Sequence, residues 1–270
     1  MTDKKNKIRR QNVLNFIMAS SLFVMAFIAY GVTAHVRHKE NPKDKLVPEF
    51  TQLIDGFRRV AFEPDKRSDE YRLVLDTIAS GKRFLISLAL LSLAVLLGLY
   101  MGLFTWVNTV FYHFVLFFDK VPALAVLPIL FIVFGLGEVS KIALILLGVF
   151  PTIVLDTSLR VQALPKQQTI KAKTLGSSST QTAYRVVLPQ ILPEVLDTLR
   201  LNFKAMILFL IAGESLAATA GLGYRIFVVR RYIAMDIIIP YVLWMSILAY
   251  LMDSMVRLWV RKRYTWNQAD

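Results

Sequence analysis

Long stretches without a charged residue constrain this chain more than any other feature of its sequence. No Asp, Glu, Lys or Arg occurs over the 24 positions from Gln11 to Ala34 or over the 35 positions from Phe84 to Phe118. A helix crosses the hydrocarbon core of a bilayer with about 20 apolar residues, so the first stretch suits one span and the second exceeds one. Hydrophobic residues make up 56% of the chain and charged residues only 19%, which excludes an ordinary soluble domain. We therefore expect an all-α integral membrane protein.

Residues 1–34 predict a basic cytoplasmic end followed by a transmembrane helix. Five Lys or Arg precede the apolar stretch, and such residues favour the cytoplasmic side. A cleaved signal peptide is the alternative, but the stretch exceeds the ~7–15 residues of a signal-peptide core and no small-residue cleavage site follows. Residues 35–83 carry 11 basic and nine acidic residues and are expected outside the cytoplasm. Four apolar residues between Phe50 and Phe57 predict an amphipathic helix there, on the outer membrane face or on the core.

Residues 84–263 are expected to form the membrane core. Its predicted spans lie at about 84–106, 121–137, 140–159, 196–216 and 237–260, and an interfacial stretch follows the first of them. Pro122 and Pro128 make the 121–137 span irregular, which a membrane tolerates where neighbours satisfy the freed backbone groups. With the amino-terminal helix this gives six spans, both termini in the cytoplasm, and a cytoplasmic tail at 264–270.

Charge and motif content narrow the classes of function. In a membrane protein, a net charge of +13 marks cytoplasmic loops and contacts with anionic lipid rather than nucleic acid. The chain has no Cys, and no carboxylate cluster accompanies His35 and His38, so no metal site is expected. It also lacks the Gly-x-x-x-x-Gly-Lys-[Ser/Thr], Gly-x-Ser-x-Gly and His-Glu-x-x-His patterns. We expect neither enzymatic activity nor a cofactor of its own.

The segment 160–193 is the most informative part of the sequence. From Thr157 to Leu192 there are five basic residues and no acidic one, which is typical of a cytoplasmic loop. Gly176 is expected to take a positive φ after a first helix, and Ser177 to Ser179 to cap a second. Pro189 and Pro193 are expected to interrupt regular structure before the chain re-enters the membrane. A basic helical pair with an apolar face suits docking in a groove of another protein; an ordinary loop is the alternative.

This segment resembles the cytoplasmic loop of ABC importer permeases, whose pattern is Glu-Ala-Ala-x-x-x-Gly-x(9)-Ile-x-Leu-Pro. Ala172, Gly176, Leu188 and Pro189 match it without a gap, and Val186 replaces Ile conservatively. Two positions depart, because Ile170 stands in place of Glu and Lys171 in place of the first Ala. Further motifs resemble the nitrate/sulfonate/taurine permeases, and the resemblance covers about 84–263. The motifs that carry this wider resemblance are Pro122 to Pro128, Phe134 to Glu138, Ser140-Lys141, Leu192-Pro193, Leu199-Arg200, Ala212 to Glu214 and Gly221 to Tyr224.

The resemblance implies a five-helix permease core plus one amino-terminal helix, in the bacterial inner membrane. It implies a homodimer with two cytoplasmic ATPase subunits, which bind the ATP, and an external solute-binding protein. The solute would be small, polar and anionic, like a sulfonate, taurine or nitrate. The loop would be the coupling helix on the ATPase, and Ile170 implies an altered partner surface. The residues assigned to this loop are Ile170, Lys171, Ala172, Lys173, Gly176, Val186, Leu188 and Pro189.

Five residues are candidates for the translocation path or a gate: Pro122, Pro128, Arg200, Lys204 and Glu214. Glu214 either lines the path or pairs structurally with Arg200 or Arg225. Arg200 and Lys204 either attract an anionic solute or extend to lipid headgroups. Two other classes stay open, a secondary transporter or channel that works without ATP and a non-transporting scaffold. A secondary transporter would predict inverted repeats and paired acidic residues at mid-membrane, which are not evident.

Overall fold

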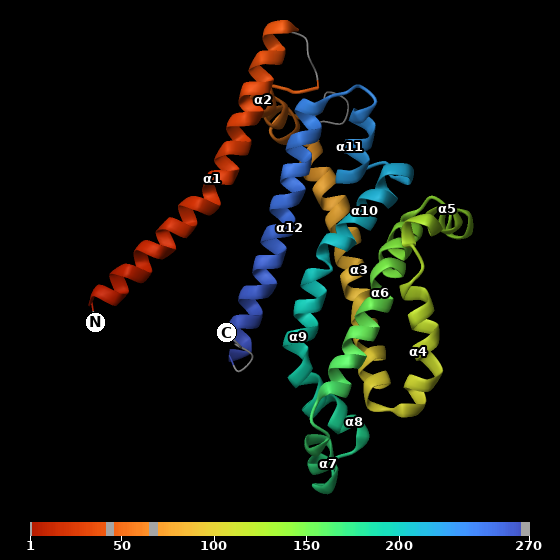
Figure 1. Ribbon diagram of the computed structural model, residues 1–270. Helices are drawn as coiled ribbons and strands as arrows, with labels where there is room; N and C mark the ends of the chain where they lie inside the picture. The colour runs from red at the N-terminus through yellow and green to blue at the C-terminus, as the bar shows by residue number, and fades with distance from the viewer. Residues whose placement is uncertain (1, 42–45, 65–69, 266–270) are drawn as a thin grey trace.

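The computed structural model describes residues 2–41, 46–64 and 70–265, without the side chains of residues 2–17, 19, 20 and 23. Helix is the regular structure throughout these ranges, which confirms the predicted all-α class. The helices are α1 (Thr2–Glu40), α2 (Phe50–Ala61), α3 (Arg72–Leu103), α4 (Thr105–Asp119), α5 (Ala123–Phe134), α6 (Glu138–Ala163), α7 (Lys166–Thr174), α8 (Ser179–Thr182), the π-helical turn η1 (Ala183–Val187), α9 (Leu188–Leu201), α10 (Phe203–Ala217), α11 (Leu222–Arg230) and α12 (Met235–Arg263). Figure 1 shows α7 and α8 at the lower end of the molecule, and α2 and α11 near the upper end.

The centre of the bundle is the contact between α3 and α6. Two glycines four positions apart on α3 allow the two backbones to approach closely. A Cβ on Gly98 would lie 2.6 Å from the Val154 carbonyl oxygen, and one on Gly102 would lie 2.4 Å from the Cβ of Val161. The side chains around this contact are buried, and Leu99 has no exposed surface. Close glycine packing therefore fixes the pair of helices on which the other elements rest.

Three helices are individually long and apolar enough to cross a membrane, namely α3, α6 and α12. Two pairs meet this requirement only together, because α4 and α5 are bent by 100° and α10 and α11 by 54°. The described residues thus offer up to five spans. The predicted amino-terminal span lies in α1, one continuous helix that diverges from the body in Figure 1. The predicted spans at 140–159 and 237–260 are confirmed as α6 and α12.

Other predicted boundaries are wrong. Helix α3 begins at Arg72 rather than near 84, since its first three turns bury polar side chains against protein rather than exposing them to lipid. The interfacial stretch after the 84–106 span is instead a helix, α4, and the span at 121–137 is reduced to the 12-residue α5. The span at 196–216 is interrupted at Asn202, between α9 and α10.

The two prolines expected to interrupt structure after the 160–193 loop lie within a helix. Pro189 lies in the first turn of α9, directly after the π-helical turn η1, and its fixed φ suits a helix. Pro193 lies further inside α9 and is buried. The chain therefore passes from the loop to the bundle without a break in helical structure.

The predicted amphipathic helix is confirmed as α2, and it packs on protein. Gly56 is buried against α12, where an added Cβ would lie 2.2 Å from the carbonyl oxygen of Asp236. Arg59 forms a 2.9 Å ion pair with the Asp236 side chain. Val60 of α2 shares an apolar cluster with Tyr241 and Met245 of α12. The segment before α3 is thus fixed to the last helix of the chain.

Candidate functional site

The loop at the lower end of the molecule is a compact helical unit closed by a glycine. Gly176 follows α7 with φ of 84°, a left-handed conformation that favours glycine. Its N–H donates to the Lys173 carbonyl at 2.9 Å, and the Ser177 N–H donates to the Ala172 carbonyl at 3.1 Å. These two bonds make a Schellman motif, which satisfies the last carbonyls of a helix. The predicted positive φ at Gly176 is therefore confirmed.

Ser178 begins the second half of the unit as a helix cap. Its hydroxyl accepts a 3.1 Å hydrogen bond from the Gln181 N–H, while the Gln181 side chain accepts one of 3.0 Å from the Ser178 N–H. This reciprocal capping box confirms the predicted cap within Ser177 to Ser179. From there α8, η1 and α9 continue as one helical path into the bundle.

The residues assigned to the loop divide into an exposed tip and a buried base. At the tip, the Ile170 side chain of α7 is 62% exposed, and Leu175, which directly follows α7, is 78% exposed. Lys171 and Lys173 of α7 are also exposed. At the base, Val187 is buried in the main apolar cluster and Leu188 packs against that cluster. Val186 and Ala172 are half-buried. The base anchors the unit, and its tip offers exposed apolar and basic side chains.

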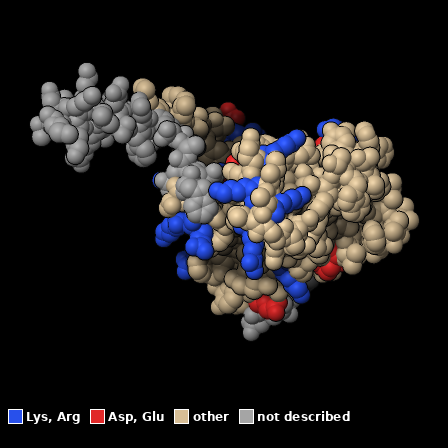
Figure 2. Space-filling model, turned by 90° about the horizontal axis from the view of Figure 1, so that it is seen from below, with Lys and Arg blue, Asp and Glu red and all other residues tan. Residues whose placement is uncertain are grey.

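Basic side chains gather at this end of the molecule. Figure 2, seen from below, shows Lys and Arg over much of the face and few Asp or Glu. The exposed basic residues near this end are Lys166, Lys171, Lys173, Arg185, Arg261, Lys262 and Arg263. A 560 Å³ cavity also opens between α7 and the ends of α3, α4 and α6, with Ile170 and Lys173 in its lining. The unit formed by residues 166–187, called the docking unit below after the role expected from the sequence, is therefore basic and borders this cavity.

A buried polar network joins α3, α6, α10 and the α10–α11 turn nearer the other end. The Arg83 guanidinium donates to Glu214 at 2.7 Å and to the Ala220 carbonyl at 2.9 Å. Ser80 donates to Glu214 at 2.7 Å, and the Gly223 N–H donates to it at 2.8 Å. With no exposed surface and four donor contacts, the Glu214 carboxylate is satisfied as a buried anion must be.

A second carboxylate meets the same guanidinium from α6. Arg83 donates through Nε and Nη2 to the two oxygens of Glu138, at 2.5 and 2.8 Å. Lys141 adds a 3.0 Å hydrogen bond to Glu138 Oε1. The Arg83 and Lys141 side chains are 7% and 3% exposed, whereas Glu138 is 56% exposed. Two buried cations are thus directed at one half-exposed carboxylate.

A third carboxylate closes the turn above the network. Asp76 accepts from the Gly221 N–H at 2.9 Å, from Arg225 at 2.8 Å and from the Tyr241 hydroxyl at 3.0 Å. Gly221 has φ of 141°, and an added Cβ would lie 2.6 Å from the Glu214 carboxylate. Glycine is therefore required where the turn passes over the buried acid.

Several predicted partners of the path residues are wrong. Glu214 pairs with Arg83 rather than with Arg200 or Arg225, because Arg200 binds Asp197 and Asp253 and Arg225 binds Asp76. Asp76, Arg83 and Glu138 were not predicted as site residues.

The remaining candidates for the path lie apart from the network. Lys204 is exposed on α10. Pro122 caps α5 and Pro128 lies inside it, and both are exposed. The structure therefore brings only Glu214, of the five predicted residues, into the buried network.

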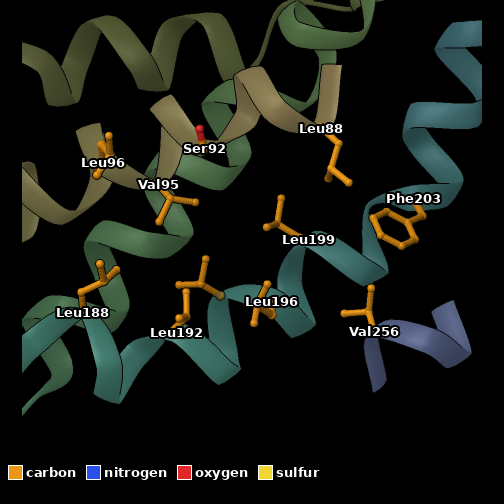
Figure 3. A pocket seen from close by; sticks show the side chains of 11 residues that line it. Leu88, Ser92, Val95, Leu96, Leu188, Leu192, Leu196, Leu199, Phe203 and Val256 are labelled. Carbon is orange, nitrogen blue, oxygen red and sulfur yellow. The ribbon is translucent and has the colours of Figure 1, made fainter. Parts of the chain in front are cut away.

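A 380 Å³ cavity lies between α3, α9 and α12, as Figure 3 shows. Its lining is apolar apart from Ser92, and includes Leu96, Leu192, Phe203 and Val256. Apart from the Ser92 hydroxyl, such a lining offers a polar solute no side chain to hydrogen-bond. The cavity instead leaves space beside the α9–α10 break, where helices can repack.

A helical membrane bundle with a basic helical unit at one end and a buried polar network nearer the other fits the class of membrane transport subunits. The family model of the "Binding-protein-dependent transport system inner membrane component" matches residues 94–263, and the chain belongs to this family.

The chain is similar to several named permeases. It is 32% identical over 190 residues to the taurine transport system permease protein TauC of Escherichia coli, over 70% of this chain and 69% of that protein. It is 32% identical over 149 residues to the "Putative aliphatic sulfonates transport permease protein SsuC" of Bacillus subtilis, over 55% of this chain and 54% of that protein. It is 29% identical over 138 residues to the formylaminopyrimidine transport permease protein ThiX of Halalkalibacterium halodurans, over 50% and 55%.

These matches confirm the resemblance drawn from the loop and the spaced motifs. The chain is a permease subunit of an ABC transporter and a multi-pass protein of the inner membrane. Its family works with an ATPase and a binding protein. Membership of this family argues against the two alternative hypotheses, a secondary transporter and a non-transporting scaffold.

Proposed function

We propose that two copies of this chain form the path by which a small anionic solute, delivered by an external binding protein, crosses the membrane. The observation that carries the proposal is the docking unit, a helical element with an exposed apolar and basic tip. ATP is bound and hydrolysed by a separate ATPase, and this chain binds no cofactor and makes no phosphate loop. Sulfonates, including taurine, are the favoured solutes because relatives named for them match the chain.

The charge distribution supports a cytoplasmic position for the docking unit. Basic residues favour the cytoplasmic side, and they gather at the end that carries α7, α8 and the end of α12. The carboxyl terminus and the start of α1 then also lie in the cytoplasm, and α2 lies outside. Anionic lipid of the inner leaflet is a natural neighbour of this basic face.

The tip of α7 is the proposed contact with the ATPase. Ile170 and Leu175 are exposed apolar anchors, and Lys171 and Lys173 fit an acidic rim around a groove. Closure of two ATPases would then move both docking units together, and the rigid base at Val187 and Leu188 would pass the movement to the bundle. Ile170 replaces the Glu of the ABC importer loop pattern, so this contact is more apolar than one made by Glu.

Copurification tests the docking. The full chain carries the tag, the candidate ATPase does not, and both are expressed with the binding protein. Gly176→Pro removes both the positive φ and the 2.9 Å backbone bond, and Lys171→Glu reverses a charge at the exposed tip. Arg58→Glu is the matched control, an exposed charge reversal on α2 at the other end. We expect both tip variants to lose the ATPase and the control to retain it.

Transport tests the rest of the proposal. In proteoliposomes with the binding protein, taurine uptake should require ATP and the ATPase. A chain that copurifies with no ATPase yet carries taurine without ATP would overturn the proposal. Retention of the ATPase by Gly176→Pro and Lys171→Glu would place the contact elsewhere.

A further inference from the structure

Glu138 differs from the other carboxylates of the buried network in its exposure. Glu214 and Asp76 have no exposed surface, whereas the Glu138 side chain is 56% exposed at the start of α6. The two cations that hold Glu138 are nevertheless almost fully buried, at 7% for Arg83 and 3% for Lys141. A carboxylate at this exposed position can be solvated by water when it turns away, but the two buried cations that it leaves cannot, so they require another anion.

The charges around Arg83 balance only while Glu138 is in place. Arg83 and Lys141 supply two positive charges, and Glu138 and Glu214 supply two negative charges within hydrogen-bond distance. If Glu138 turns away, two cations remain with one carboxylate. The site then carries a net positive charge in a poorly solvated position, and it attracts an anion.

The geometry left by Glu138 suits an oxyanion with two free oxygens. Arg83 presents Nε and Nη2 as a fork, and its third nitrogen is held by Glu214 and the Ala220 carbonyl, so the fork is fixed. Lys141 adds a third donor on the same side. Such a fork binds a carboxylate or another planar pair of oxygens in a bidentate manner. The N-terminal end of α6 also favours negative charge at this position.

We propose that Arg83 and Lys141 bind the anionic group of the transported solute, and that Glu138 occupies their site in its absence. This inference rests on the proposed function of anion import, and it narrows the solute to one with a carboxylate or sulfonate group. Glu138 acts as an internal competitor that keeps the buried cations neutralised between transport cycles. The solute must displace it, so binding is weaker than the two cations alone would give, and release is easy.

Two other arginines of the bundle are held differently. Arg225 is paired with Asp76, which is fully buried. Arg200 is paired with two carboxylates at once, Asp197 and Asp253.

The absence of native Cys allows a direct test at the site. In Glu138→Cys the thiol lies where the competing carboxylate was, and N-ethylmaleimide reports its accessibility. The full chain is studied in complex with its ATPase in nanodiscs at constant ionic strength. We expect ethanesulfonate to slow the modification with saturation, and neutral ethanesulfonamide of the same size to have no effect.

Two variants on this background examine Lys141. Lys141→Met removes one charged hydrogen bond, so the ethanesulfonate concentration that halves the modification rate should rise on the order of tenfold. Lys141→Arg keeps the charge and should stay near the parent. Equal protection by the sulfonate and the sulfonamide, no protection by either, or no change in Lys141→Met would overturn the proposal. Melting temperature and copurified ATPase establish that each variant is folded.

Taurine uptake by the unaltered complex separates this proposal from the one on which it rests. If ATP-dependent taurine uptake occurs but ethanesulfonate leaves Cys modification unchanged, anion import stands and the Arg83–Lys141 site is wrong. If the complex carries none of the anionic solutes tested, the solute class itself is wrong and this site falls with it.

Discussion

Arg83 of α3 and Glu214 of α10 lie 131 positions apart in sequence and are joined by a 2.7 Å hydrogen bond between almost fully buried side chains. The same carboxylate accepts from Ser80 of α3 and from the Gly223 N–H at the start of α11. One carboxylate thus holds three helices together. Its removal leaves several donors and a cation without their acceptor.

Replacing Glu214 should strongly destabilise the protein. Breaking a buried ion pair from one side costs about 3–5 kcal/mol, because the remaining charge stays buried. We expect Glu214→Ala to lower the melting temperature of the detergent-purified chain clearly, and the double variant Arg83→Met, Glu214→Ala to lose less than the two single variants added together. Additive losses would show that the two side chains do not depend on each other.

Helix α3 should not tolerate a methyl group at Gly98, where it packs on α6, but should tolerate one at Gly81. In Gly98→Ala the new Cβ would meet the Val154 carbonyl oxygen at 2.6 Å, so the helices must separate. In Gly81→Ala, on the same helix, the new Cβ meets nothing within 4 Å, and a gain of about 0.5–1 kcal/mol is expected. Thermal unfolding of the two variants compares them. Similar melting temperatures would contradict the close packing.

The capping box at Ser178 should control the local stability of the docking unit. Ser178→Ala removes the hydroxyl that accepts from the Gln181 N–H, at a cost of about 1 kcal/mol. Hydrogen exchange of the 179–187 backbone should become faster, while exchange in α3 stays unchanged. Ser179→Ala is the matched control, since Ser179 lies exposed at the start of α8. Equal exchange rates over residues 179–187 in the two variants would show that the Ser178 cap does not stabilise this segment.

The attachment of α2 to α12 should depend on Gly56. A Val side chain there cannot fit, because the Asp236 carbonyl oxygen would lie 2.2 Å from its Cβ. Gly56→Val should therefore expose Arg58 and Arg59 to rapid cleavage by trypsin, whereas Ile54→Ala, at a 67% exposed position, should not. Resistance of Gly56→Val to trypsin would mean that α2 is held mainly by its other contacts.

Local chemistry explains why the docking unit could be predicted from sequence. Gly176 and Ser178 act on their immediate neighbours, so a glycine stop and a serine cap are visible in a short stretch. The spans at α6 and α12 could also be predicted, since hydropathy alone marks a straight helix of sufficient length. Each of these inferences needs only residues close together in the chain.

Long-range pairing explains what could not be predicted. In the sequence, Arg83 lies at the end of a polar segment, and nothing there indicates that α3 begins at Arg72. The carboxylates that bind Arg83, Glu138 and Glu214, come 55 and 131 positions later in the chain. Pro122 marks the break between α4 and α5 in the sequence, but nothing in the sequence indicates the 100° angle between them. The partner of Glu214 is Arg83 on another helix, so residues close to Glu214 in the sequence do not indicate it.

Helix α3 is continuous over 32 residues and contains no proline, whereas α5, α6 and α12 each contain one and α9 contains two. At 1.5 Å per residue it is about 48 Å long. Near one end Tyr100 lies against Tyr184 of η1, with ring centroids 6.4 Å apart, and near the other Arg83 holds Glu138 and Glu214. One unkinked helix therefore connects the docking unit with the buried network, so a displacement at Tyr184 has a direct path to the Arg83 side chain.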